Sequence, residues 1–234
     1  MSAPRSEHPR LAALAERAGV ELEGAHPTEV LRFAAEEFGD RLCVTSSMAD
    51  AVLAHLASGV LPGVHVLFLD TGYHFAETIG TRDAVAATLP VTVVTVTPEQ
   101  TVAAQDAEYG PRLYERDPDR CCALRKVAPL ARALEPYHAW ASGIRRDESV
   151  SRRNVRVVEW DARRGLVKVN PLACWRQADV DAYVAEHGVL VNPLVQEGYR
   201  SIGCAPCTRP VSDGEDQRAG RWAGSAKTEC GIHT

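Results

Sequence analysis

Cys230 is the residue of this chain best suited to nucleophilic chemistry. It lies between Lys227 and His233 in a stretch without apolar periodicity, and Gly224 and Gly231 loosen the backbone on either side. Buried cysteines usually belong to apolar strands or helices, so this setting favours a reactive thiol over core packing. Neighbouring cations favour the thiolate, which is the nucleophilic form. The stretch by itself also fits an exposed thiol without a role, so the other cysteines have to be considered.

Four further cysteines come in two pairs, Cys121 with Cys122 and Cys204 with Cys207. Together they supply four thiolates, the donor set of a Cys₄ zinc site or an iron–sulfur cluster, whereas a C-x-x-C alone could be a redox pair. Structural zinc ligands normally have two or more residues between them. The directly adjacent pair therefore favours an iron–sulfur cluster, with zinc and a redox pair as the alternatives.

Two arginine-rich stretches offer a site for an anion. The first follows a predicted strand at 140–144 and consists of Arg145, Arg146, Arg152 and Arg153. Guanidinium groups match the geometry of phosphate and sulfate, and a position just beyond a strand favours ligand contact over a solvated charged loop. The second stretch, RAGRW at 218–222, has two arginines three residues apart, which a helix would place on one face.

The composition limits the class of protein. The chain has 234 residues, of which 45% are hydrophobic and 24% charged, as in an ordinary globular protein. No uncharged apolar run is long enough to span a bilayer, and the first residues lack the apolar core of a signal peptide, so we expect a cytoplasmic protein without a membrane partner. A net charge of −5 argues against a broad nucleic-acid surface.

The chain has seven cysteines, and this odd count favours metal binding or catalysis over a disulfide framework. We interpret Cys43 and Cys174 as structural thiols, because both lie in apolar stretches.

Strands and helices alternate after residue 40. Apolar strands are predicted at 42–45, 64–69 and 91–96, with helical patterns between them. This alternation predicts a parallel sheet with helices on both faces, in which ligands bind beyond the carboxyl ends of the strands. The turn Ser-Ser-Met-Ala-Asp at 46–50 falls there and offers hydroxyls and N–H groups to an anion, although an ordinary helix N-cap is the alternative. Asp-Thr-Gly at 70–72 also follows a strand, and it is common as a plain turn.

The other segments frame this sheet. Helical periodicity over residues 1–40 predicts an N-terminal helical cap, and alternation over residues 155–170 predicts a hairpin. We therefore divide the chain into the cap at 1–40, an α/β domain at 41–211, and a flexible C-terminal tail at 212–234.

The sequence resembles the thioredoxin-dependent adenylyl-sulfate (APS) reductases of assimilatory sulfate reduction, within the wider family of APS and phosphoadenylyl-sulfate (PAPS) reductases. Seven motifs, in order from about residue 40 onward, carry the resemblance. They are SSMADAVL at 46–53, LDTGYHF at 69–75, CCALRKVAPL at 121–130, GIRRDES at 143–149, IGCAPCTRPV at 202–211, RAGRW at 218–222 and KTECGIH at 227–233.

This resemblance implies an adenine-nucleotide α-hydrolase-like fold, an oxidoreductase activity and one [4Fe-4S] cluster as the cofactor. It implies that the α/β domain at 41–211 is the nucleotide-binding and iron–sulfur domain, and that the tail at 212–234 is catalytic. It implies that Cys230 is the catalytic nucleophile. The implied cluster ligands are Cys121, Cys122, Cys204 and Cys207. The implied substrate-binding residues are Ser46, Ser47, Leu69, Asp70, Thr71, Gly72, Lys126, Gly143, Arg145, Arg146, Arg218, Arg221 and His233.

The implied reaction is the reduction of APS to sulfite and AMP, through an S-sulfocysteine on the enzyme and with thioredoxin as electron donor, in sulfate assimilation and cysteine biosynthesis. A PAPS reductase, with the same chemistry on a 3′-phosphorylated nucleotide, is the nearest alternative, although the cysteine pairs favour APS. A PP-loop ATP pyrophosphatase would need an SGGxDS-type loop where this chain has SSMAD at 46–50, and a non-catalytic zinc module is a third alternative. The sequence leaves the oligomeric state open, a homo-oligomer included.

Overall fold

The computed structural model describes residues 6–212, 214–225 and 227–233. Its centre is a six-stranded sheet in the order β3-β2-β1-β4-β6-β5. The strands are β1 (Leu42–Thr45), β2 (His65–Leu69), β3 (Thr92–Val96), β4 (Ala139–Ser142), β5 (Val158–Asp161) and β6 (Leu166–Val169). Neighbouring strands run parallel, except that β5 and β6 form the antiparallel hairpin predicted from the sequence. The predicted α/β fold with a mostly parallel sheet is confirmed.

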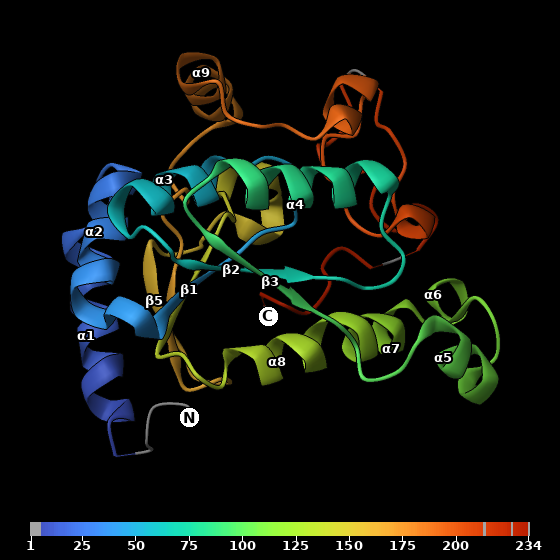
Figure 1. Ribbon diagram of the computed structural model, residues 1–234, viewed down its shortest axis with the longest axis horizontal. Helices are drawn as coiled ribbons and strands as arrows, with labels where there is room; N and C mark the ends of the chain where they lie inside the picture. Colours follow the sequence, from blue (N-terminus) through green and yellow to red (C-terminus); the bar gives the residue numbers. More distant parts are fainter. Residues whose placement is uncertain (1–5, 213, 226, 234) are drawn as a thin grey trace.

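Helices cover both faces of this sheet (Figure 1). On one side lie α1 (His8–Glu21), α2 (Pro27–Phe38), α3 (Val52–Val60), α4 (Ala76–Thr88) and α9 (Gln177–His187). On the other side lie α7 (Pro118–Cys122) and α8 (Ala128–Leu134), with α5 (Val102–Tyr109) and α6 (Leu113–Arg116) beyond the end of α7. Of the helices described, none is long and apolar enough to cross a bilayer.

Two hydrophobic clusters separate along the two faces because side chains alternate along a strand. In β1, Leu42 and Val44 belong to the larger cluster, whereas Cys43 belongs to the smaller one. The larger cluster also contains Leu11 of α1 and Val30 of α2, so both N-terminal helices pack into the main core. The division of the chain into domains at residues 40 and 211 stays a prediction.

The segment that joins α7 to α8 is a π-helical turn, Ala123–Val127. The N–H group of Ala128 donates a hydrogen bond to the carbonyl of Ala123, five residues back. Pro129 follows at the start of α8 and has no N–H group for a normal helical bond, so the wider turn lets the helix continue. This turn also rotates Lys126 into the interior, where the side chain is buried.

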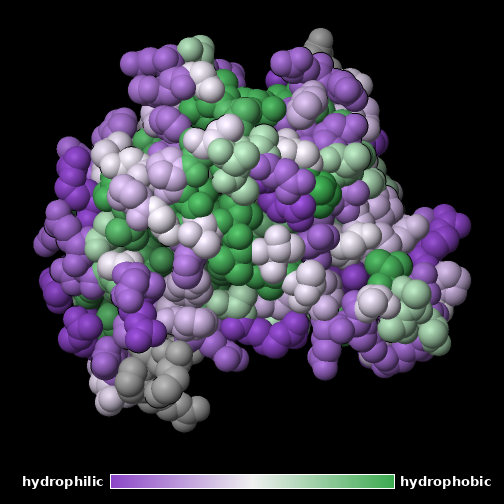
Figure 2. Space-filling view, viewed as in Figure 1, coloured by the Kyte–Doolittle hydropathy of each residue, from purple (hydrophilic) through white to green (hydrophobic). Residues whose placement is uncertain are grey.

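The sheet has a topological switch beside β1. The chain runs from β1 to β2 and β3 on one side and returns to β4 on the other, so that Thr45 and Ser142 end up as neighbours at the carboxyl ends of β1 and β4. Parallel sheets bind ligands at such points. On the face seen in Figure 2, apolar residues gather in the middle and hydrophilic residues surround them.

Candidate active site

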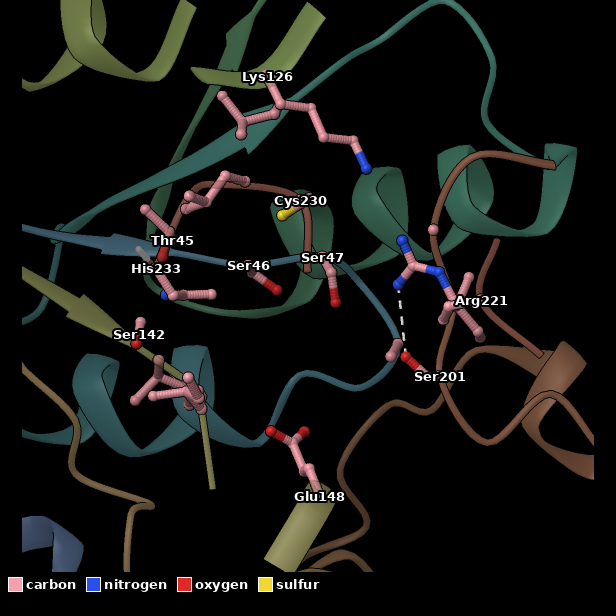
Figure 3. Close-up of a pocket in the computed structure, with 18 of the residues that line it drawn as sticks. Thr45, Ser46, Ser47, Lys126, Ser142, Glu148, Ser201, Arg221, Cys230 and His233 are labelled. Carbon is pink, nitrogen blue, oxygen red and sulfur yellow. Dashed lines mark hydrogen bonds between the residues drawn. The ribbon is translucent and has the colours of Figure 1, made fainter. Parts of the chain in front are cut away.

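A pocket of about 230 Å³ opens at the carboxyl ends of β1, β2 and β4. Figure 3 shows its polar lining. Nine sequence-predicted residues line it: Ser46, Ser47, Leu69, Lys126, Gly143, Arg218, Arg221, Cys230 and His233. They come from distant parts of the chain, and the strand ends bring them together. Glu148, Arg200 and Ser201 also line the pocket and were not predicted, whereas Arg152, another lining residue, belongs to the arginine-rich stretch expected to contact an anion.

The turn at 46–50 forms one wall of the pocket and is held firmly. The hydroxyl of Ser46 accepts a hydrogen bond of 3.1 Å from the N–H group of Met48, which has a left-handed backbone with φ of 58°. That conformation is costly for a residue other than glycine. Asn192 offsets the cost by donating its side-chain amide to the carbonyl of Met48. Ser47 is exposed and borders the pocket, so it is the serine of this turn available to a ligand.

The turn at 70–72 serves a different part of the molecule. Gly72 has φ of 74°, and the chain turns there toward the cysteine pairs. The Thr71 hydroxyl lies 3.2 Å from the sulfur of Cys204. The carboxylate of Asp70 accepts the N–H group of Gly72. The structure therefore places Asp70, Thr71 and Gly72 outside the pocket lining, and of the motif LDTGYHF at 69–75 it is Leu69 and His74 that reach it.

The arginine-rich loop also divides between two locations. Arg145 contacts Asp147 and donates to Gln177, whereas Arg146 forms a two-pronged ion pair with Glu23, at 2.5 and 2.9 Å. Neither arginine lines the pocket. The loop consists of two short 3₁₀ turns, Arg146–Glu148 and Val150–Arg152, which point successive side chains in different directions. It is Arg152, at the end of the second turn, that faces the pocket.

Two predictions about single thiols have opposite outcomes. Cys43 is fully buried, as predicted, and burial raises the pKa of its thiol. The prediction for Cys174 is wrong, because this residue is exposed and its sulfur lies 3.6 Å from a carboxylate oxygen of Glu23. After β6 the chain turns toward the end of α1, and this turn brings Cys174 out of the apolar core.

Besides the exposed Arg200, the pocket lining contains two cations that lie beside Cys230, Lys126 and Arg221. Neither forms an ion pair with a carboxylate in the described part of the chain. The buried Nε atom of Arg221 has no hydrogen-bond partner among the described atoms, and one Nη atom contacts Ser201 at 3.4 Å. The terminal nitrogens of both residues point toward the same part of the cavity, next to the sulfur of Cys230 (Figure 3). Unpartnered buried donors of positive charge are the lining an oxyanion requires.

The environment keeps Lys126 positively charged. Burial opposes the charge, but the negative charge of Cys204, Cys230 and Cys122 in their ionised form outweighs it and raises the pKa of the ammonium group above its usual value. His233 behaves differently, because burial, together with the charge of Lys168, moves its pKa well below the usual value. His233 therefore contributes a neutral ring, stacked on Trp140 with 5.9 Å between centroids, and no positive charge.

The C-terminal arm, defined here as the described residues 227–233, is docked over the pocket. Arg164 donates a 2.8 Å hydrogen bond to the carbonyl of Ile232, and the side chain of Ile232 packs against the smaller hydrophobic cluster. Lys227 forms an ion pair with Asp119. These contacts leave Cys230 half-buried, between the pocket and an outer surface hollow that it also lines.

The two cysteine pairs meet in a second cavity behind the first. Cys121, Cys122, Cys204 and Cys207 all line it, and Lys126 borders both cavities. Burial raises the pKa of Cys121 to about 12 and that of Cys207 to about 11, and the neighbouring thiols add to the shift. Among the described residues no three potential ligands converge tightly enough to hold a single metal ion. The four thiols line one cavity, so the two pairs that the sequence predicted to act together lie at one place.

These features define an α/β protein with a half-buried cysteine thiol that faces a pocket lined by cations at the carboxyl ends of parallel strands. A comparison with family models matches residues 41–210 to the phosphoadenosine phosphosulfate reductase domain, and the chain belongs to this family. The resemblance seen in the sequence is thus confirmed.

Relatives over nearly the whole chain agree with this assignment. The adenosine 5′-phosphosulfate reductase of Streptomyces coelicolor is 69% identical over 95% of this chain and 94% of its own length. The enzyme of the same name from Mycobacterium tuberculosis is 52% identical over 98% of this chain and 97% of its own. Both relatives bear the name of a reductase, the oxidoreductase class that the sequence predicted.

Solved structures support the fold. A phosphoadenylyl-sulfate reductase from Candida auris, in a phosphate complex, superposes with a TM-score of 0.71 at 27% identity, covering 89% of this chain and 99% of that one. The FMN adenylyltransferase of Candida glabrata shares only the fold, with a TM-score of 0.58 at 12% identity, covering 85% of this chain and 67% of its own.

Proposed function

We propose that this protein reduces APS to sulfite and AMP, with thioredoxin as the electron donor and an S-sulfocysteine on Cys230 as the intermediate. The single observation that carries the proposal is the position of Cys230. Among the residues that the structure describes, it is the one cysteine that lines the pocket, and it lies beside Lys126 and Arg221. A thiol next to two cations suits attack on an anionic sulfur centre.

The relatives favour APS over PAPS as the substrate. Curated proteins named for adenosine 5′-phosphosulfate match at 52–69% identity, whereas the PAPS reductase structure matches at 27%. The two cysteine pairs, which already favoured APS in the sequence analysis, line a single cavity in the structure. We include a cytoplasmic location in the proposal, because thioredoxin chemistry requires a reducing compartment.

The first half-reaction is a displacement at sulfur. The Cys230 thiolate attacks the sulfur atom of APS, the bond from sulfur to the bridging phosphate oxygen breaks, and AMP leaves with the electron pair. Negative charge grows on the leaving phosphate and on the sulfonyl oxygens. Lys126 and Arg221 offer positive charge in a largely buried setting, where such charge stabilises a transition state more strongly than in water.

The second half-reaction removes the sulfonate. A thiolate of thioredoxin attacks the Cys230 sulfur, the bond between the two sulfur atoms of the S-sulfocysteine breaks, and sulfite leaves with the electron pair. The second thiol of thioredoxin then displaces Cys230 from the mixed disulfide. The dithiol of thioredoxin is oxidised, the sulfate-derived sulfur is reduced, and the Cys230 thiolate is restored.

Cys121, Cys122, Cys204 and Cys207 fit one [4Fe-4S] cluster as the resident cofactor. The raised pKa values of Cys121, Cys122 and Cys207 mean that these bare thiols hold their protons, which metal binding would release. The cluster, when bound, would supply a fixed local charge beside Lys126, and the thioredoxin dithiol accounts for both electrons of the reduction.

Metal analysis after anaerobic purification tests the cofactor. We expect about four irons and four sulfides per chain, no stoichiometric zinc, and a brown chromophore. The Cys207→Ser variant loses the chromophore, and Cys174→Ser, which changes an exposed thiol away from the cavity, keeps it. One zinc per chain with a colourless protein would contradict the assignment.

A turnover assay tests the proposed function as a whole. With reduced thioredoxin and APS, we expect AMP and sulfite in equal amounts. With PAPS at the same concentration, we expect kcat/KM to fall by about 100-fold or more, since a 3′-phosphate adds charge that must be paired or desolvated. Comparable or faster turnover of PAPS would assign the protein to the alternative substrate.

Gly203 gives a test of Arg221 that leaves the arginine in place. A Cβ atom at this position would lie 2.3 Å from a terminal nitrogen of Arg221, so Gly203→Ala forces the guanidinium to move. We expect AMP to bind about tenfold more weakly, the loss of one charge-assisted hydrogen bond. Gly80→Ala, which adds a Cβ with nothing within 4 Å, is the matched control and leaves the affinity unchanged. Calorimetric titration with AMP measures both, and equal affinities in the two variants would remove Arg221 from the site.

A further inference from the structure

Glu229, the residue before Cys230, is held by more polar contacts than any other side chain in the described part of the arm. Arg152 binds its carboxylate with two parallel hydrogen bonds of 2.8 Å, from Nε and from one Nη. Arg218 approaches the same carboxylate at 3.1 Å, and the hydroxyl of Ser151 donates to it at 3.2 Å. Arg218 also donates to the carbonyl of Thr228, at 3.0 Å.

This cluster is largely sheltered from water. The side chains of Glu229, Arg152 and Arg218 are 13%, 9% and 11% exposed. Burial opposes ionisation of Glu229, but the hydrogen bonds and charge of Arg152 hold its pKa below the usual value. Solvent-exposed ion pairs contribute little to stability. A guanidinium that binds a carboxylate with two hydrogen bonds in a sheltered site strongly fixes the relative position of the two side chains.

The contacts also define what Arg152 can do. Its Nε and one Nη bind Glu229, and the other Nη binds Glu148 at 2.5 Å. The three nitrogens of the guanidinium are therefore committed to two carboxylates. This differs from Lys126 and Arg221, which have no carboxylate partner in the part of the chain that the structure describes.

We propose that Glu229 is a positioning residue: its ion pairs with Arg152 and Arg218 clamp the arm so that the adjacent Cys230 faces the substrate pocket. The proposal rests on the function proposed above and adds that the cations of the pocket have two different roles. Arg152 and Arg218 hold the arm through Glu229, and Lys126 and Arg221 are left for the substrate's oxygens.

Position along the backbone is the reason why this anchor governs the sulfur. Glu229 is bonded directly to Cys230, whereas the anchors at Lys227 and Ile232 are separated from it by further rotatable bonds. Gly231, with φ of 79°, follows Cys230 and adds flexibility on that side. Without the clamp, the sulfur would sample a wider range of positions. A displacement of about 1 Å from the reacting atom can cost about 100-fold in rate.

The test uses Glu229→Gln and Glu229→Ala in the cluster-loaded protein with three measurements. The first is the alkylation rate of Cys230 by iodoacetamide without ligand, followed by peptide mapping. The second is the affinity for AMP. The third is the single-turnover rate of S-sulfocysteine formation from APS. Glu215→Gln is the matched control, since it removes a carboxylate paired with an arginine, Arg209, at 3.1 Å on the exposed surface of the same region.

For Glu229→Ala we expect alkylation about tenfold faster or more and single turnover about 100-fold slower, with AMP affinity within about twofold of the parent. Glu229→Gln keeps the shape but weakens the pairing, so it lies between the parent and the alanine variant. The control matches the parent in all three measurements.

Unchanged alkylation and unchanged single turnover in Glu229→Ala would overturn the clamp. A parallel loss of AMP affinity would also overturn it, because it would indicate a general structural role. If the parent forms no S-sulfocysteine yet the variant is alkylated faster, the clamp stands and the proposed function fails.

Discussion

Replacement of Cys230 by serine abolishes sulfite formation, with the rate falling by about 10⁴-fold or more. A serine hydroxyl is hardly ionised at neutral pH without a dedicated base, whereas a thiol beside cations supplies a thiolate. Loss of a nucleophile is among the largest single-residue effects in catalysis. The pocket cations, Lys126 and Arg221, are untouched by the change, so AMP affinity stays within about twofold of the parent.

Single-turnover assays and calorimetry with AMP measure this outcome. Cys174→Ser is the control because its thiol is exposed and does not line the pocket, and it retains full activity. Iron content, measured in both variants, shows whether the cluster is intact. Substantial activity in Cys230→Ser would eliminate Cys230 as the nucleophile.

The second large effect is expected for Lys126→Met, which keeps the length of the side chain and removes the charge. Lys126 is buried, has no carboxylate partner among the described residues, and points toward the space beside Cys230. Removing one preorganised charge from a transition-state site typically costs about 10²–10³-fold in rate. Because the charge acts where negative charge develops, the single-turnover rate falls much more than the affinity for AMP.

Arg132→Met is the control for this variant. It removes a positive charge from α8, close in sequence to Lys126, but its side chain is exposed and does not line the pocket. Its rate stays within about twofold of the parent. A Lys126→Met rate within about threefold of the parent would show that Lys126 has no catalytic role.

The sequence predicted the sheet well because burial leaves a local signal. Apolar runs such as Leu42–Thr45 and His65–Leu69 indicate buried strands, and their alternation with helices indicates that the strands pair in parallel. The cysteine pairs were also recognisable, since directly adjacent cysteines are rare for packing reasons alone. Family motifs supplied the remaining assignments.

The direction of side chains in irregular turns was not predictable. Arg145, Arg146 and Arg152 belong to one loop, yet Arg152 alone faces the pocket. The partner of Arg146 is Glu23, 123 residues earlier in the sequence, and no local sequence pattern predicts such an ion pair. Cys174 was misplaced for the same reason, because an apolar stretch does not reveal where the chain turns outward.

Glu229 shows a different limit. It stands beside the predicted nucleophile in the motif KTECGIH at 227–233, but a single glutamate in a polar segment is normally solvated. Its significance depends on Arg152 and Arg218, which come from two other loops and meet only in the folded chain. The feature of the sequence that could have indicated this role of Glu229 is the number of arginines in the two arginine-rich stretches, which need carboxylate partners.

Intact-protein mass spectrometry of the cluster-loaded enzyme after one turnover with APS, in the absence of thioredoxin, tests the central claim most directly. We predict a mass gain of one SO₃ group per chain, mapped to Cys230, with an equal amount of AMP released. Addition of reduced thioredoxin removes the added mass and releases sulfite. AMP release without any covalent adduct, or an adduct on another residue, would contradict the proposal that Cys230 carries the sulfonate.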